Sequence, residues 1–230
     1  MSQARQSRRA APVQPDELDA PLPRGRQAWL AVLVMGIVVA AVIGSGLLIK
    51  HAIEPMVPAA LANCVTSTQI SPHQFIGPQP MCITASQKLE ATMTTTQGDV
   101  VIKLHPEVAP VTVNNFVVLA THGYFNGLGF WKSEDWVLQG GDPRGDGRGG
   151  PGYNLPDEGS ATPWGLAAVG MARVPGGAVN GSQFFIMKAN WPGSGPTAVY
   201  NRFGTVKSGM EKVQSMTTSD TIVSITIKVS

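Results

Sequence analysis

The chain has 230 residues, a formal net charge of +2 at pH 7 and a hydrophobic content of 43%. The charges are unevenly distributed: residues 1–50 hold six Lys or Arg and three Asp or Glu, whereas residues 89–230 hold ten and eleven. A nucleic-acid surface needs clustered cations that replace the counterions of the phosphates. The nearly neutral C-terminal part therefore argues against a nucleic-acid partner.

An apolar segment without a charged residue extends over residues 28–49. As a helix it would be ~33 Å long at ~1.5 Å per residue, enough to cross a hydrocarbon core ~30 Å thick. Residues 1–27 are polar and have no apolar period, which is typical of disorder. The sequence predicts a disordered cytoplasmic tail over residues 1–27 and a single transmembrane helix over residues 28–49.

The flanks of the apolar segment predict its orientation. Five arginines precede it, whereas Lys50 alone follows closely, so the positive-inside bias places residues after 50 outside the cytoplasm. A cleaved signal peptide is an alternative, because residues 60–62 read Ala-Leu-Ala. A lipoprotein box at residues 61–64 is another. Neither is favoured, since the apolar segment is too long for the first and Asn63 is large for the second.

The stretch 50–88 contains five prolines among small polar residues, which predicts an extracytoplasmic linker. It also holds both cysteines of the chain, Cys64 and Cys82. Outside the cytoplasm such a pair predicts one disulfide, which would contribute about 3 kcal/mol in the chain-entropy model. The alternative is a pair of free thiols. A metal site is not expected, because the two cysteines lack the close spacing of zinc ligands.

From about residue 89 the sequence changes to short β-prone runs separated by loops rich in Gly and Pro. Within residues 106–122, Val113, Phe116, Val117 and Ala120 share one helical face, which predicts an amphipathic helix. A second helix is expected at 208–216. Many short strands with few helices favour a closed or nearly closed antiparallel barrel over residues 89–230.

Three blocks of this domain resemble the cyclophilin family of peptidyl-prolyl isomerases and follow one another in that family's order. They are FWK at 130–132 with WVLQGGDP at 136–143, GMA at 170–172 with NGSQFFI at 180–186, and YNRFGTV at 200–206. Residues 109–116 look like the family's first helix. The resemblance covers about residues 90–230, and with the apolar segment it indicates a bacterial membrane-anchored form.

The resemblance implies a mainly β fold: a closed eight-stranded antiparallel barrel capped by two helices. The implied activity is rotation about the bond preceding proline, without a cofactor or a metal. Amide resonance sets a barrier of ~18–20 kcal/mol, so a catalyst must hold the proline and stabilise the twisted amide. The expected partners are proline-containing polypeptides, and a cyclosporin-type ligand is a further candidate.

The resemblance also assigns roles to individual residues. Lys132 and Gln139 would be catalytic, and Gln139 would hydrogen-bond the substrate backbone. The substrate-binding residues would be Trp136, Val137, Ala172, Arg173, Gln183, Phe185, Trp191 and Tyr200. Trp136, Val137 and Phe185 would form the apolar floor under the proline ring. Without the surrounding motifs, ordinary barrel core would be the simpler interpretation of these three residues.

Lys132 departs from the family, which has arginine at the matching position. Lysine keeps a positive donor but lacks the planar fork of a guanidinium, so weakened isomerisation is expected. Arg144 and Arg148 could substitute, although solvated loop charges are the favoured interpretation. The predicted function is isomerisation during folding of exported proteins at the membrane surface. The alternative is a catalytically weak module that binds proline peptides as a chaperone or scaffold.

Overall fold

The computed structural model describes residues 57–159, 163–173, 176–193, 196 and 199–230. The chain divides into two units, Met1–Glu54 and Pro55–Ser230, and the description concerns the second. The predicted tail 1–27 and transmembrane helix 28–49 lie outside the described residues. Among the residues that are described, no helix has the length and apolar character needed to cross a bilayer.

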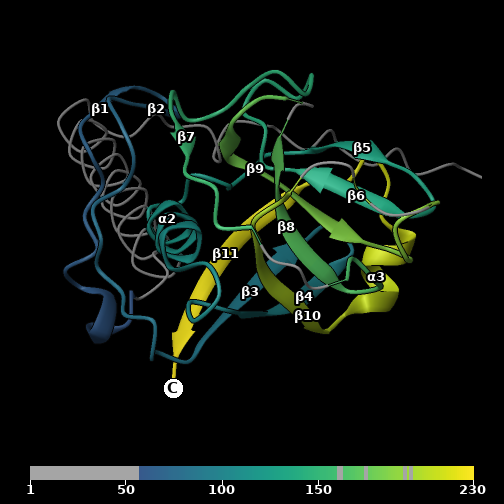
Figure 1. Ribbon diagram of the computed structural model, residues 1–230, viewed down its shortest axis with the longest axis horizontal. Helices are drawn as coiled ribbons and strands as arrows, with labels where there is room; N and C mark the ends of the chain where they lie inside the picture. The colour runs from purple at the N-terminus through teal and green to yellow at the C-terminus, as the bar shows by residue number, and fades with distance from the viewer. Residues whose placement is uncertain (1–56, 160–162, 174–175, 194–195, 197–198) are drawn as a thin grey trace, which may run out of the picture. The chain divides into compact units, whose positions relative to one another are not determined.

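An antiparallel sheet forms the body of the domain (Figure 1). In the order of pairing, its strands are β11 (Ile222–Val229), β3 (Leu89–Thr95), β4 (Gly98–Leu104), β10 (Arg202–Ser208), β8 (Ala168–Arg173), β9 (Val179–Met187), β6 (Val137–Gly140) and β5 (Phe130–Ser133). A ninth strand, β7 (Asn154–Leu155), pairs with β9 off this path. In β3 every second side chain is buried, as expected for a strand with one face on a core.

The expectation of a closed barrel is wrong: the sheet is a half-barrel. Its end strands β5 and β11 share no ladder in the described part of the chain and meet only at the isolated bridge between Gly129 and Thr221. Three backbone hydrogen bonds flank this bridge, from Gly127 N to Ile222 O at 2.7 Å, from Ile222 N to Leu128 O at 2.9 Å and from Phe130 N to Asp220 O at 3.3 Å. β5 has four residues and β11 has eight. The short β5 therefore cannot follow β11 along its length.

Asp220 stabilises the backbone beside the bridge between these two strands. Its carboxylate accepts hydrogen bonds from Thr217 N at 2.8 Å, Thr96 Oγ1 at 2.7 Å and Gln97 Nε2 at 2.9 Å. The Thr217 amide and then the Thr96 hydroxyl favour the ionised form and lower the pKa of Asp220 to about 2. A lowered folded-state pKa gives stability that is present above the unfolded pKa and is lost as the pH falls toward 2.

We expect Asp220→Asn to lower the free energy of unfolding by about 2 kcal/mol at neutral pH, the scale for hydrogen bonds to a charged group. Urea unfolding at pH 7, 4 and 2 would measure it. The difference between wild type and variant should shrink as the pH falls from 4 to 2. A difference that stays constant over this range would contradict the role of the carboxylate.

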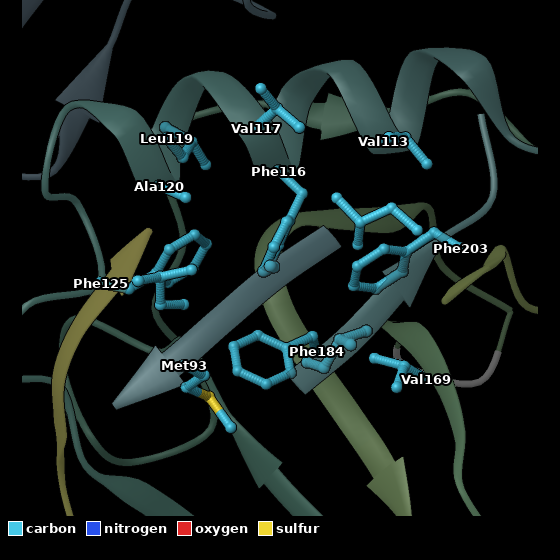
Figure 2. Close-up of a cluster of buried hydrophobic side chains, with 14 of the residues drawn as sticks. Met93, Val113, Phe116, Val117, Leu119, Ala120, Phe125, Val169, Phe184 and Phe203 are labelled. Carbon is cyan, nitrogen blue, oxygen red and sulfur yellow. The ribbon is translucent and has the colours of Figure 1, made fainter. Parts of the chain in front are cut away.

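Helix α2 (Pro110–Thr121) packs against the face of the sheet that carries Phe184 and Phe203 (Figure 2). Pro110 suits the first turn because it has no N–H to satisfy there, and the carboxylate of Glu158 accepts the amides of Val111 and Thr112 at 2.9 and 2.8 Å. The ring of Phe116 lies 5.0–6.0 Å from the rings of its three phenylalanine neighbours, Phe125, Phe184 and Phe203. The second helix, α3 (Met210–Ser215), is short.

Residues 57–88 belong to the segment expected to be a linker, but in the structure they pack onto the domain. We call them the N-terminal strap. The strap contains the short helix η1 (Ala59–Leu61) and the hairpin of β1 (Gln69–Ser71) and β2 (Gln74–Phe75). Its apolar side chains Leu61, Phe75 and Ile83 are buried in the main core. The described residues of that core lie between Leu61 and Ile227, so the unit Pro55–Ser230 has a hydrophobic core of its own.

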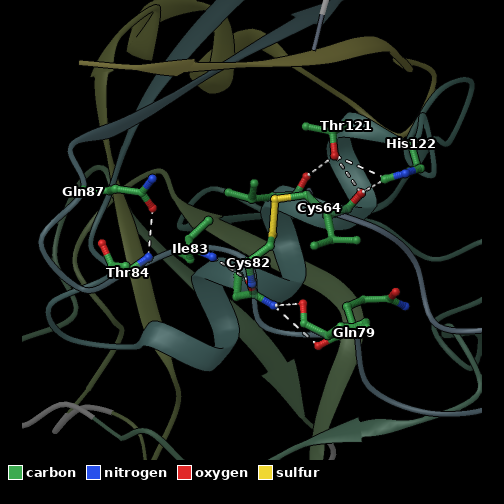
Figure 3. The surroundings of a disulfide bond; sticks show 12 residues. Cys64, Gln79, Cys82, Ile83, Thr84, Gln87, Thr121 and His122 are labelled. Atoms are coloured by element: carbon green, nitrogen blue, oxygen red, sulfur yellow. Dashed lines mark hydrogen bonds between the residues drawn. A yellow bond between two sulfur atoms is a disulfide. The ribbon is translucent and has the colours of Figure 1, made fainter. Parts of the chain in front are cut away.

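A disulfide joins Cys64 to Cys82 within the strap (Figure 3). Beside it, Asn114 of α2 accepts the amide of Cys82 at 2.8 Å and donates to Pro80 O at 2.9 Å. The strap thus covers the face of α2 turned away from the sheet, which explains why residues 112–120 are buried without interruption. A helix covered on one face only would leave its outer side chains exposed.

Candidate active site

Nine of the ten residues with a predicted catalytic or substrate-binding role line one cavity of about 180 Å³. They are Lys132, Trp136, Val137, Gln139, Ala172, Arg173, Phe185, Trp191 and Tyr200. Strand register explains the assembly, because Gln139 on β6 pairs with Lys132 on β5 and with Phe185 on β9. Directly paired residues project from the same face of a sheet, so residues far apart in the sequence converge there.

The floor of the cavity is aromatic and forms a cluster separate from the main core. The Phe185 ring is 3% exposed. Its centroid lies 5.5 Å from that of Tyr200 and 6.2 Å from that of Trp191. Trp191 in turn lies 5.0 Å from Trp136. The planes of Phe185 and Tyr200 meet at 84° and those of Phe185 and Trp191 at 74°, so the rings form an apolar pocket of the kind that can hold a pyrrolidine ring.

Trp164 belongs to this cluster, although no role was predicted for it from the sequence. Its ring centroid lies 5.0 Å from that of Phe185, and its carbonyl oxygen accepts the amide of Trp191 at 2.9 Å. Gly170 makes room for it, since a Cβ there would lie 2.4 Å from the Trp164 ring. A tryptophan just ahead of the second motif block was the signal available in the sequence.

Lys132 lies at the edge of the cavity, about one third exposed. Its Nζ is 3.1 Å from Glu134 Oε1 and 5.5 Å from the centroid of the Trp136 ring. The first contact is an ion pair that competes with a substrate for the ammonium, and the second places the ammonium near the negative face of the indole. The geometry places a cation beside the surface where a proline would bind.

Gln183 does not line the cavity but is buried directly behind it. Its Oε1 accepts Gln139 Nε2 at 3.1 Å and Trp131 Nε1 at 3.2 Å, and its Nε2 donates to Gly149 O at 2.8 Å. Gln183 therefore orients Gln139. Among the described residues the Oε1 of Gln139 has no hydrogen-bond partner, which leaves an acceptor for a backbone N–H of a bound peptide.

Arg173 closes the side of the cavity next to Tyr200. Its guanidinium donates from Nη1 to Val199 O at 2.8 Å and forms an ion pair with Asp157 through Nη2. The Arg173 side chain is only 10% exposed, and its Nε has no partner among the described residues. Burial raises the pKa of the Tyr200 phenol, so Tyr200 is neutral at physiological pH and offers an O–H donor.

Two other cavities lack this combination. Arg144 and Arg148 border a polar cavity of about 350 Å³, so the structure does not place either arginine at the aromatic floor. A larger cavity of about 510 Å³ beside β3 and β4 has no aromatic residue in its lining. The aromatic cavity is therefore the candidate site despite its smaller volume.

The comparisons with known proteins agree with the fold and the cavity. Residues 90–229 match the family model described as cyclophilin type peptidyl-prolyl cis-trans isomerase/CLD. The peptidyl-prolyl cis-trans isomerase B of Bacillus subtilis is 37% identical over 128 residues, which are 55% of this chain and 88% of that protein. A Staphylococcus saprophyticus relative is 43% identical over 108 residues, which are 45% of this chain and only about half, 54%, of the relative.

A solved structure of a Cryptosporidium parvum cyclophilin type peptidyl-prolyl cis-trans isomerase is also similar. It has a TM-score of 0.55 and 26% identity and covers 61% of this chain and 98% of its own. A second crystal structure of that protein, determined in the presence of the dipeptide Ala-Pro, gives a TM-score of 0.54, 27% identity and coverage of 60% and 98%. The chain belongs to the cyclophilin-type peptidyl-prolyl cis-trans isomerase family. The family predicted from the motifs is confirmed.

Proposed function

We propose that the Pro55–Ser230 unit catalyses cis-trans isomerisation of prolyl bonds in the cavity between Lys132 and Phe185. The observation that carries this proposal is the convergence of an aromatic floor and a cation in one cavity. The chemistry needs no bond cleavage, so a nucleophile and a metal are unnecessary. What the site must supply is preferential binding of the twisted amide.

Each group of the cavity would contribute to that preference. The proline ring would lie on Phe185, and Gln139, oriented by Gln183, would hold the peptide backbone. As the amide twists, its nitrogen becomes pyramidal and regains a lone pair, which a positive donor such as the Lys132 ammonium can stabilise. A gain of ~1.4 kcal/mol from this contact corresponds to tenfold in rate.

A second function, binding of proline peptides without significant turnover, is favoured by one observation. The Lys132 ammonium already has a carboxylate partner, Glu134, at 3.1 Å. A protease-coupled isomerisation assay on wild type and Lys132→Arg would separate the two functions. A wild-type rate above background supports the isomerase. No wild-type rate, with a gain in the arginine variant, supports the binding module.

The ion pair with Glu134 gives a prediction of its own. Glu134→Gln should raise kcat/KM about threefold, because a partly exposed pair holds the ammonium with only ~0.2–1 kcal/mol and the variant releases it toward the substrate. The same assay measures the change, with the exposed Glu211→Gln as the matched control. A lower rate in Glu134→Gln would mean that the carboxylate helps to position Lys132.

We propose further that the domain acts outside the cytoplasm on exported polypeptides, tethered to the membrane by residues 28–49. The apolar segment and the arginines ahead of it support this location, as does the disulfide of the strap. A tether would raise the local concentration of the domain where chains emerge. Carbonate extraction and protease accessibility of the full chain in spheroplasts test it; solubility after extraction would contradict it.

Trp191 in the cavity lining supports a cyclosporin-type ligand. Competition between that ligand and the peptide substrate in the isomerisation assay would test it.

A further inference from the structure

The N-terminal strap lies outside the matched family region, which begins at residue 90, yet it contacts a loop of the catalytic domain. This glycine-rich loop comprises residues 145–152. Gln74 Nε2 donates to Gly150 O at 2.7 Å, and Phe75 N donates to Pro151 O at 2.9 Å. Just beyond the loop, Gln79 Nε2 donates to Tyr153 Oη at 2.9 Å. The β1–β2 hairpin and the chain after it thus hold the end of the loop.

The loop and the strap approach each other too closely for a side chain. Gly152 has a φ of +92°, and a Cβ there would lie 2.9 Å from Phe75 O. The start of the loop is held differently, by the buried carboxylate of Asp142, which accepts Asp146 N at 3.1 Å and Gly147 N at 2.6 Å. The domain itself therefore fixes the first half of the loop, and the strap fixes the second half.

The middle of the same loop holds Gln183 behind the candidate site. Gly149 O accepts both Gln183 Nε2 at 2.8 Å and Asn180 Nδ2 at 3.0 Å. Gln183 Oε1 in turn accepts Gln139 Nε2 at 3.1 Å. A path of hydrogen bonds that runs through the backbone of Gly149 and Gly150 thus connects Gln74 of the strap with Gln139 in the cavity.

The other end of the strap is held by the disulfide and by α2. The Cys82 amide donates to Asn114 Oδ1 at 2.8 Å beside the disulfide. The buried ring of Phe75 lies 6.2 Å from that of Tyr124, which follows α2. These contacts determine where the hairpin lies on the domain.

We infer that Gln74 is a positioning residue for the active site: the strap, closed by the Cys64–Cys82 disulfide, braces the glycine-rich loop so that Gln183 orients Gln139 toward the substrate. The inference rests on the proposed function for its effect on catalysis. Because the chain has only these two cysteines, a reductant acts on the strap alone. Loss of the disulfide and loss of the Gln74 side chain should then have effects of the same kind.

The test compares Gln74→Ala with Gln69→Ala in the full chain. Gln69 is the matched control, because it is an exposed glutamine of the same hairpin whose Nε2 donates only within the hairpin, to Ser71 O at 3.2 Å. Gln74→Ala should lower kcat/KM about fivefold, mostly through KM, which is the scale of one neutral hydrogen bond. Dithiothreitol should lower the wild-type rate in the same direction. The side-chain amide signals of Gln139 and Gln183 in the Pro55–Ser230 unit should shift in Gln74→Ala.

The outcomes separate this inference from the proposed function. Shifted Gln183 and Gln139 signals with a raised KM in Gln74→Ala, and neither change in Gln69→Ala, support the bracing. Unchanged signals and an unchanged KM in Gln74→Ala overturn it, whatever the wild-type rate. If wild type shows no turnover, the proposed function fails, and the amide signals together with the affinity for a proline peptide still decide the inference.

Discussion

Lys132→Ala is expected to lower kcat/KM for prolyl isomerisation by about 100-fold, on the scale of removing one preorganised donor from a transition state. Lys132 lies beside the aromatic floor with its side chain partly exposed, whereas Arg173, the other cation in the lining, is paired with Asp157. The substitution therefore removes charge from the site without opening a cavity in the core. The affinity for a proline peptide should change much less, because the floor remains.

The protease-coupled assay gives the rate, and titration of a proline peptide gives the affinity. Lys228→Ala, at an exposed lysine of β11, is the matched control and should behave as wild type. Lys132→Arg should equal or exceed wild type, because a guanidinium adds a planar fork of donors. A Lys132→Ala protein with the wild-type rate would exclude the ammonium from catalysis.

Phe185→Leu is expected to weaken both peptide affinity and kcat/KM about tenfold. The substitution removes the aromatic ring that would face the proline, and with it aromatic contacts that contribute ~0.5–1.5 kcal/mol per pair. Phe185 packs against Trp164 and Tyr200. Truncation to alanine would be more severe, about 3–5 kcal/mol of unfolding free energy, and would mix loss of fold with loss of site.

The adjacent residue provides the control for this prediction. Phe184 precedes Phe185 on β9 but projects from the opposite face, into the main core (Figure 2). Phe184→Leu should lower stability in urea unfolding and leave peptide affinity unchanged in the folded protein. If both variants lose affinity equally, the aromatic floor is no more than a part of the domain's general packing.

The site could be predicted largely from the sequence, because its residues belong to motifs on neighbouring strands. The motif residues Gln139 and Phe185 become paired once β6 and β9 lie side by side. Gln183 was predicted to border the groove, whereas the structure buries it behind Gln139. Trp164 belongs to none of the motif blocks, and the packing of its ring against Phe185 shows its part in the site.

The strap was the largest difference between sequence and structure. Its prolines and small polar residues are typical of a linker, and its burial depends on a partner surface, the outer face of α2, that local composition does not encode. The half-barrel was not predicted from the sequence for a related reason. Closure would require β5 to pair with β11 along its length, and β5 has four residues whereas β11 has eight. Strand lengths of this kind follow from tertiary contacts more than from local propensity.

The most direct test of the account is NMR exchange spectroscopy on an Ala-Pro peptide with the Pro55–Ser230 unit at catalytic concentration. Uncatalysed interconversion takes ~10–100 s and gives no exchange peaks on the time scale of mixing. If this cavity catalyses isomerisation, the wild-type unit gives exchange peaks between the cis and trans signals, and Lys132→Ala abolishes them. A peptide that binds the wild-type unit and still shows no exchange peaks would contradict catalysis by this site.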